Sequence, residues 1–245
     1  FVFNEDSLGG GYYDYLYHEK YFFYFSNDFF NSLKNYGMDQ VNEGVRNSPV
    51  FYMMFSLFLK MGFEIESLKF INLIIIVPII FFFNKCINIS YKNIPSNTKF
   101  YILSILLLSP TIRTLLIWPY PLLWALSFFI MAIYFYLNFE ETSNSQKKIR
   151  LAYCNIFFVP LAAYFTPNFA IFSIYFFYKY YLNFGISKKT LNIVLLNIFL
   201  ALPAIYFFVL KDFYLLNSNV AKIDPLTKFN ISNNLRKLFI ISFLF

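Results

Sequence analysis

Residues 68–83 read LKFINLIIIVPIIFFF, and this stretch decides the fold class because only one of its sixteen residues, Lys69, is charged. A helix needs about 17–25 mostly apolar residues to cross the ~30 Å hydrocarbon core of a bilayer, and this run comes close to that length. The run is continuous, whereas a strand of a membrane β-barrel alternates between apolar and polar residues. The stretch therefore predicts a membrane-spanning helix.

Similar apolar runs fill most of the chain that follows. Only 13% of all residues are charged and 59% are hydrophobic, whereas an ordinary soluble domain has about 25% and about 45–50%. This composition excludes a soluble cytosolic enzyme, a disordered chain and a coiled coil. For residues 67–245 we therefore predict an all-α fold, a polytopic transmembrane helical bundle. Its further spans are expected at residues 100–117, 122–139, 151–165, 169–182 and 191–210, with another beginning at 235–245.

The chain before residue 67 has a different character. Residues 1–49 hold seven of the thirteen acidic residues and lack any apolar stretch long enough to span, and we expect short helices around residues 15–25 and 29–36. Residues 49–63 are apolar but too short to span, with Pro49 suited to a first helical turn and Gly62 to a helix end. Residues 1–66 are thus predicted to be an acidic external first loop containing short interfacial helices. Because the chain begins at Phe1 and ends inside an apolar run, we expect it to be truncated at both ends.

The distribution of Lys and Arg among the loops predicts the orientation. Residues 84–99, 140–150 and 183–190 each contain two or three of them, whereas the turns at 118–121 and 166–168 contain none. Basic loops stay on the cytoplasmic side, so residues 1–66 are expected outside, as are residues 211–234 despite their three lysines. The net charge of +7 is then a property of these loops and does not indicate nucleic acid. We expect an integral protein of the bacterial inner (plasma) membrane.

The acidic residues of the external segment are the first candidates for chemistry. Carboxylates just outside a bilayer, such as Asp6 and Asp14, can deprotonate an acceptor or hold a divalent metal ion. The alternative is that these carboxylates are solvated surface groups without a chemical role. Gly9-Gly10-Gly11 lets the backbone approach a ligand closely, and Tyr15 can stack on a sugar ring.

Histidine and arginine side chains extend this set. His18 lies four residues after Asp14, on the same face of a helix, and is either a base or metal ligand or a packed histidine; Glu19 follows it. Arg46 precedes the short apolar helix, and Arg113 lies within a predicted span near its outer end. Each arginine either clamps a phosphate bidentately or reaches the head groups as a snorkelling cation.

Several of these features together resemble a known family. The early acids Asp6 and Asp14, the sequence Asn47-Ser48-Pro49-Val50-Phe51-Tyr52 before Gly62-Phe63, and the later Leu108-Ser109-Pro110-Thr111-Ile112-Arg113 are similar to the first external loop and following spans of the GT-C superfamily. These are integral-membrane glycosyltransferases that use polyprenyl-phosphate-linked sugars. The likeness covers roughly residues 5–140. It implies that an acid of this loop is the catalytic base or binds metal, although Glu5-Asp6 stands where the family has an Asp-Glu pair.

The resemblance predicts a membrane glycosyltransferase that moves a sugar from a polyprenyl-phosphate-linked donor to a glycan, lipid or protein acceptor at the outer face of the lipid membrane. An acid would deprotonate the acceptor, and an arginine would stabilise the departing phosphate; a divalent metal ion is the one cofactor to consider. The alternative is a transporter or flippase of lipid-linked sugars without chemistry, which would keep ionisable residues near the membrane midplane. Here the acids cluster outside the spans, which favours the enzyme. The residues assigned are catalytic Asp14, preferred for its glycine and tyrosine neighbours, and Asp6, and substrate-binding Arg46, Arg113, His18, Glu19 and Tyr15.

Overall fold

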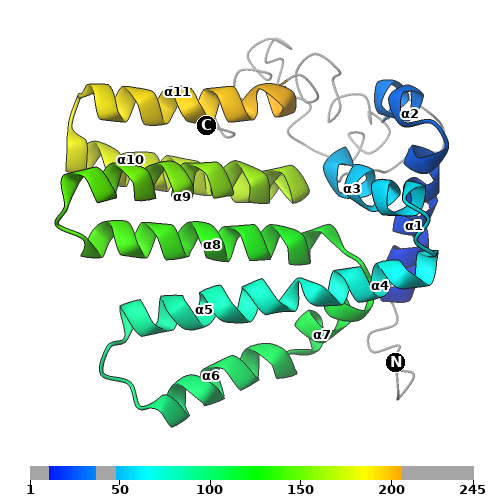
Figure 1. Ribbon diagram of the computed structural model, residues 1–245, viewed down its shortest axis with the longest axis horizontal. Coiled ribbons are helices and arrows are strands. Elements are labelled where there is room, and N and C mark those ends of the chain that lie inside the picture. The colour runs from blue at the N-terminus through cyan, green and yellow to red at the C-terminus, as the bar shows by residue number, and fades with distance from the viewer. Residues whose placement is uncertain (1–10, 37–47, 206–245) are drawn as a thin grey trace, which may run out of the picture.

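A computed structural model of the protein describes residues 11–36 and 48–205 (Figure 1). This part of the chain consists of helices and short links, without a strand, so the predicted all-helical class is confirmed for it. The outer helices are α1 (Gly11–Asn27), α2 (Phe29–Asn35) and α3 (Pro49–Lys60). The remaining elements are α4 (Ile65–Ile74), α5 (Ile76–Ser90), α6 (Ser96–Leu108), α7 (Pro110–Ile117), α8 (Pro121–Glu141), α9 (Ser145–Phe165), the 3-10 helix η2 (Pro167–Ile171), α10 (Phe172–Phe184) and α11 (Lys188–Ile205).

The run that decides the fold class lies in α4 and α5, which together form the long helix Ile65–Ser90. The two helices meet at Ile75. Pro78 accounts for this break, because proline offers no N–H to the carbonyl four residues earlier, that of Ile74, and its ring clashes with that carbonyl. The 26 residues extend for about 39 Å at about 1.5 Å per residue, which exceeds the ~30 Å hydrocarbon core.

Two helices in the described ranges are long and apolar enough to cross a membrane, namely Ile65–Ser90 and Pro121–Glu141. The predicted span at residues 100–117 is formed by two helices, α6 and α7, which bend by 58° at Ser109-Pro110, and it adds a third crossing if the pair counts as one. The runs at 151–165 and 169–182 are helical, as are the described residues 191–205 of the run at 191–210, but none of them meets the same criterion of length and hydropathy. Helix α9 begins with a basic turn, and α10 has 13 residues. The last five residues of the run at 191–210 lie outside the described residues, so this predicted span stays a prediction.

The short helices predicted before the first span are present. Residues 15–25 and 29–36 correspond to α1 and α2, and residues 49–63 correspond to α3. Pro49 is the first residue of α3, after Ser48, and Gly62 follows the helix with a φ of 90°, a left-handed conformation that glycine adopts without strain. The 12 residues of α3 reach about 18 Å, too short for a ~30 Å core.

The long helices lie side by side, and the short ones cap one end of them (Figure 1). Helix α8 packs between α5 and α9, and α9 packs against α11. The links α5–α6, α8–α9 and α10–α11 lie together at the opposite end from α1, α2 and α3. These links and the helix turns beside them hold the Lys and Arg residues of the predicted cytoplasmic loops, whereas Lys20, Lys34 and Lys60 lie on α1, α2 and α3. The loops with Lys and Arg, which alternate along the sequence with turns that have none, therefore lie together at one end of the helices.

Aromatic rings join α1 to α3. Phe22 of α1 stacks on Phe55 of α3 with ring centroids 5.0 Å apart, and Tyr21 lies 4.9 Å from Tyr52. All four side chains are fully buried. Aromatic pairs of this kind stabilise a fold beyond the burial of their area, so the outer helices form a core of their own.

A buried asparagine fastens α4 to α7 and α8. Asn72 has no exposed surface, and its Nδ2 donates to the carbonyls of Leu115 at 2.8 Å and Leu116 at 2.9 Å. The indole Nε1 of Trp124 donates to Asn72 Oδ1 at 3.0 Å. The last carbonyls of a helix have no partner within it, so Asn72 supplies what the C-terminal turn of α7 lacks.

Candidate functional site

Helix α1 lies against the turn between α7 and α8. Trp118 of this turn contacts Tyr12 and Tyr15 of α1, with ring centroids 5.2 Å and 5.1 Å apart. Tyr120 contacts His18 at 4.9 Å. The acidic external segment and the proline-marked turn were predicted to share one face, and the structure brings them into contact. We refer to Asp14 together with Tyr15, Trp118 and Tyr120 as the α1–turn site.

Asp14 is the exposed acid of the α1–turn site. It lies in the first turn of α1, where the partial positive charge of the helix end favours a carboxylate. Its side chain is exposed and close enough to the turn to act on Tyr120, whose pKa is raised by burial and then by the negative charge of Asp14. An accessible carboxylate at the edge of an aromatic surface can accept a proton from a hydroxyl group that docks there.

His18 is a packed histidine and not an accessible base. Its side chain is 2% exposed, and its Nδ1 forms a hydrogen bond of 2.8 Å with the hydroxyl of Tyr52. Burial lowers the pKa of His18 to about 4, so the ring is neutral near pH 7. The sequence left two interpretations of His18 open, a base or metal ligand and a packed histidine, and its burial supports the packed histidine. A substrate could contact His18 only if the surrounding side chains moved.

Tyr15 is also buried, which differs from the exposed sugar-stacking ring expected. Its side chain is 3% exposed, and its hydroxyl makes no hydrogen bond with any residue that the structure describes. Burial, followed by the charges of Glu19 and Glu66, raises the pKa of Tyr15 far above its usual range. The ring therefore supports Trp118 from beneath, while Tyr12 is the more exposed ring on the same indole.

Lys69, the one charged residue of the apolar run at 68–83, extends the α1–turn site. Lys69 Nζ lies 5.0 Å from the ring centroid of Trp118 and 5.4 Å from that of Tyr15, and it pairs with Glu66 Oε2 at 2.7 Å. The side chain is only 13% exposed. A cation over aromatic faces is stabilised by about 0.5–2 kcal/mol, more when water is excluded. The spacing Glu66–Lys69, one turn apart at the start of a span, is the signal that could have identified this pair.

The other assigned residues lie elsewhere or outside the described ranges. Glu19 is half-buried on α1, one residue after His18. Arg113 is exposed on α7, the helix that packs on α4. Asp6 and Arg46 lie outside the described residues, so the choice between Asp6 and Asp14 stays a prediction.

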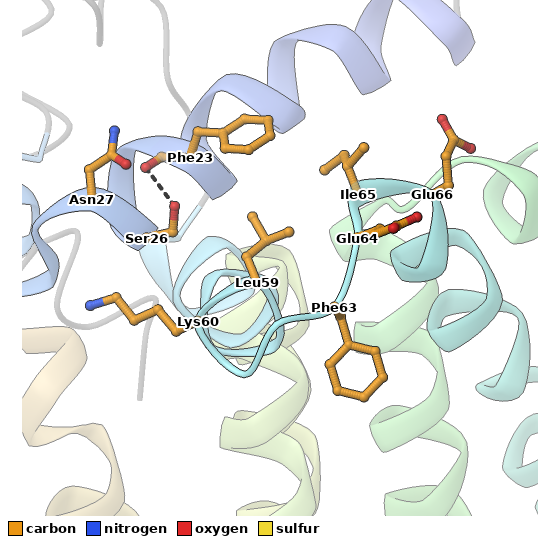
Figure 2. A pocket seen from close by; sticks show the side chains of 9 residues that line it. All are labelled: Phe23, Ser26, Asn27, Leu59, Lys60, Phe63, Glu64, Ile65 and Glu66. Atoms are coloured by element: carbon orange, nitrogen blue, oxygen red, sulfur yellow. Dashed lines mark hydrogen bonds between the residues drawn. The ribbon is translucent and has the colours of Figure 1, made fainter.

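A hollow of about 650 Å³ opens between the C-terminal half of α1 and the link from α3 to α4 (Figure 2). Glu64 and Glu66 lie on the α4 side of it and Lys60 projects from the end of α3. Lys60 also lies over the ring of Phe29, 5.7 Å from its centroid. Among the residues that the structure describes, no three His, Cys, Asp or Glu side chains are grouped as metal ligands.

The α1–turn site thus combines one accessible carboxylate, a wall of aromatic rings and one partly buried cation held by a second carboxylate. This set can accept a proton, contact the apolar face of a sugar ring and balance the charge of a phosphate. No known protein family, curated protein or solved structure matches the chain.

Proposed function

We propose that this protein is a membrane glycosyltransferase of the GT-C type, which transfers a sugar from a polyprenyl-phosphate-linked donor to an acceptor at the outer face of a bacterial plasma membrane. The observation that carries the proposal is the exposed carboxylate of Asp14 near Tyr120, on the helix whose Tyr12 and Tyr15 contact Trp118, at the end of the helices opposite the basic links. Because basic links favour the cytoplasmic side, this end faces the compartment in which lipid-linked sugars are consumed.

The proposed reaction is a displacement at the anomeric carbon. The acceptor hydroxyl gives its proton to Asp14 while its oxygen bonds to the anomeric carbon, and the bond between that carbon and the phosphate oxygen breaks. The polyprenyl phosphate leaves with the electron pair. Lys69, held by Glu66 at 2.7 Å, and Arg113 are the described cations assigned to balance its charge, because fixed charges aimed at a developing anion lower the barrier.

Transfer from a labelled polyprenyl-phosphate sugar by the full-length protein in vesicles tests the proposal. Asp14→Asn removes the charge with little change of shape, and activity should fall by about 10²–10⁴-fold, as for other general bases. Asp28→Asn is the matched control, since Asp28 caps α2 by accepting from Asn31 N at 3.1 Å and asparagine caps equally well. Wild-type turnover in Asp14→Asn together with loss in Asp6→Asn would move the role to Asp6.

Lys69→Gln separates the cation from the base. It should lower kcat, since the charge acts on the leaving group, and leave the pH dependence set by the base in place. Lys20→Gln, an exposed change on α1, should have no effect. If the intact protein never transfers sugar but carries lipid-linked sugars across vesicles, the transporter alternative replaces the enzyme.

A further inference from the structure

A second hollow lies at the opposite end of the molecule, between the α8–α9 and α10–α11 links. Its volume is about 480 Å³, and its lining includes Ser145 and Lys148 at the start of α9 and Asn183, Ser187, Lys188 and Lys189 around the start of α11. Three of the lining side chains are lysines, and none is acidic. We call it the basic pocket.

Two of the three lysines of the basic pocket, Lys148 and Lys189, contact neutral groups. Lys148 Nζ donates to Asn183 Oδ1 at 3.3 Å and Lys189 Nζ donates to Ser145 Oγ at 2.9 Å, each across the two links. The same ammonium groups lie over the rings of Phe139 and Phe184, at 5.2 Å and 5.6 Å from the centroids. These contacts orient the charges without neutralising them. The ion pairs Lys69–Glu66 and Lys92–Glu141 of the described residues involve none of the three pocket lysines.

Three backbone amides near this pocket already have side-chain acceptors. Asn144 Oδ1 already accepts from the amides of Gln146 and Lys147 at the start of α9, and Ser187 Oγ accepts from that of Thr190 at the start of α11. An anion would therefore be bound by the lysine side chains and by the hydroxyl groups beside them. Like charges gathered in one hollow repel each other until such a counterion arrives.

We propose that the basic pocket binds the phosphate of an anionic phospholipid head group. The position of the pocket favours a lipid as the ligand. It lies at the end of α8, a helix long enough to span a membrane. The links around it are basic, which predicts that they face the cytoplasmic leaflet. Basic pockets between membrane helices on that side bind anionic head groups. The proposal is separate from the transfer reaction, because the α8–α9 and α10–α11 links that line the pocket lie at the opposite end of the helices from α1, which forms the α1–turn site (Figure 1).

The test compares lipids and variants in the full-length protein. Phosphatidylglycerol should stay bound in native mass spectrometry and raise Tm in detergent, and phosphatidylcholine should do neither. The variant Lys148→Gln/Lys188→Gln/Lys189→Gln should bind phosphatidylglycerol about a hundredfold more weakly, at about fivefold per lysine near a membrane surface.

The matched control, Lys85→Gln/Lys147→Gln/Arg150→Gln, removes the same charge from exposed positions of the same end. It should keep most of the lipid affinity. Equal loss in both triple variants would reduce the effect to general surface charge and overturn the proposal. Retained binding in the pocket variant, with an unchanged helical circular dichroism spectrum, would also overturn it. So would stabilisation by inorganic phosphate as large as that by phosphatidylglycerol, since the ligand would then be a free phosphate.

Discussion

Replacing Asn72 by leucine tests whether the buried amide holds α4, α7 and α8 together. The change removes both donors to the carbonyls of Leu115 and Leu116 and the acceptor of Trp124 Nε1. Each orphaned group costs about 1–3 kcal/mol when water cannot reach it, but relaxation reduces this, and hydrogen bonds between membrane helices average about 0.6 kcal/mol. For three bonds we expect a loss of about 2–5 kcal/mol of unfolding free energy.

The assay is reversible unfolding of the full-length protein in bicelles or mild detergent. Asn192→Leu on the exposed side of α11 is the matched control and should change stability by less than about 0.5 kcal/mol. Trp124→Phe removes one of the three bonds, and in the Asn72→Leu background it should cost less than it does alone, because that bond is already lost. Equal stability of Asn72→Leu and Asn192→Leu would refute the assignment of the amide as a fastener.

Three further predictions concern the outer helices and the orientation. Because the pKa of His18 is about 4 when folded and about 6.5 when unfolded, the unfolded chain binds the extra proton between these values. Stability should therefore fall by up to about 3 kcal/mol from pH 7 to pH 4, with a smaller slope in His18→Gln, measured by urea titration. Gly62→Ala should lower stability by about 1–2 kcal/mol, since φ is 90° and no atom lies within 4 Å of the added carbon, which leaves only backbone strain; equal Tm would contradict this. In intact cells an impermeant thiol reagent should label Asn27→Cys and spare Gln146→Cys, and the reverse pattern would invert the orientation.

The secondary structure could be predicted because it depends on local signals. Pro49 and Gly62 marked the two ends of α3. The 58° bend at Ser109-Pro110 was not predicted, since residues 100–117 were expected to form one span. The number of helices that qualify as spans could not be predicted, because the run at 151–165 lies in a helix with a basic first turn and the run at 169–182 forms a short 3-10 helix and a 13-residue α-helix. Periodicity and composition indicate where helices form, but a helix must also be long enough to cross the hydrocarbon core of a bilayer.

The candidate site was predicted only in part, because its contacts are long-range. The shared face of Asp14 and the turn at Trp118 followed from orientation, and the structure places them together. The partner of His18 is 34 residues away, a distance that no sequence pattern reports, so its burial was left open. Lys69 was not predicted as a site residue, because a single charge in an apolar run gives no indication of its partners. Only the fold shows that the rings of Tyr15 and Trp118 lie beside it.

The fastening by Asn72 also fixes the order in which the protein can mature during synthesis. The ribosome makes Asn72 well before its partners: Leu115 follows 43 residues later, and Trp124 follows 52 residues later. Until then the side-chain amide of Asn72 has none of these partners, and an unsatisfied amide is costly in hydrocarbon. We therefore expect α4 to pack in its final position only after α7 and α8 have been made, because Asn72 finds its partners only then.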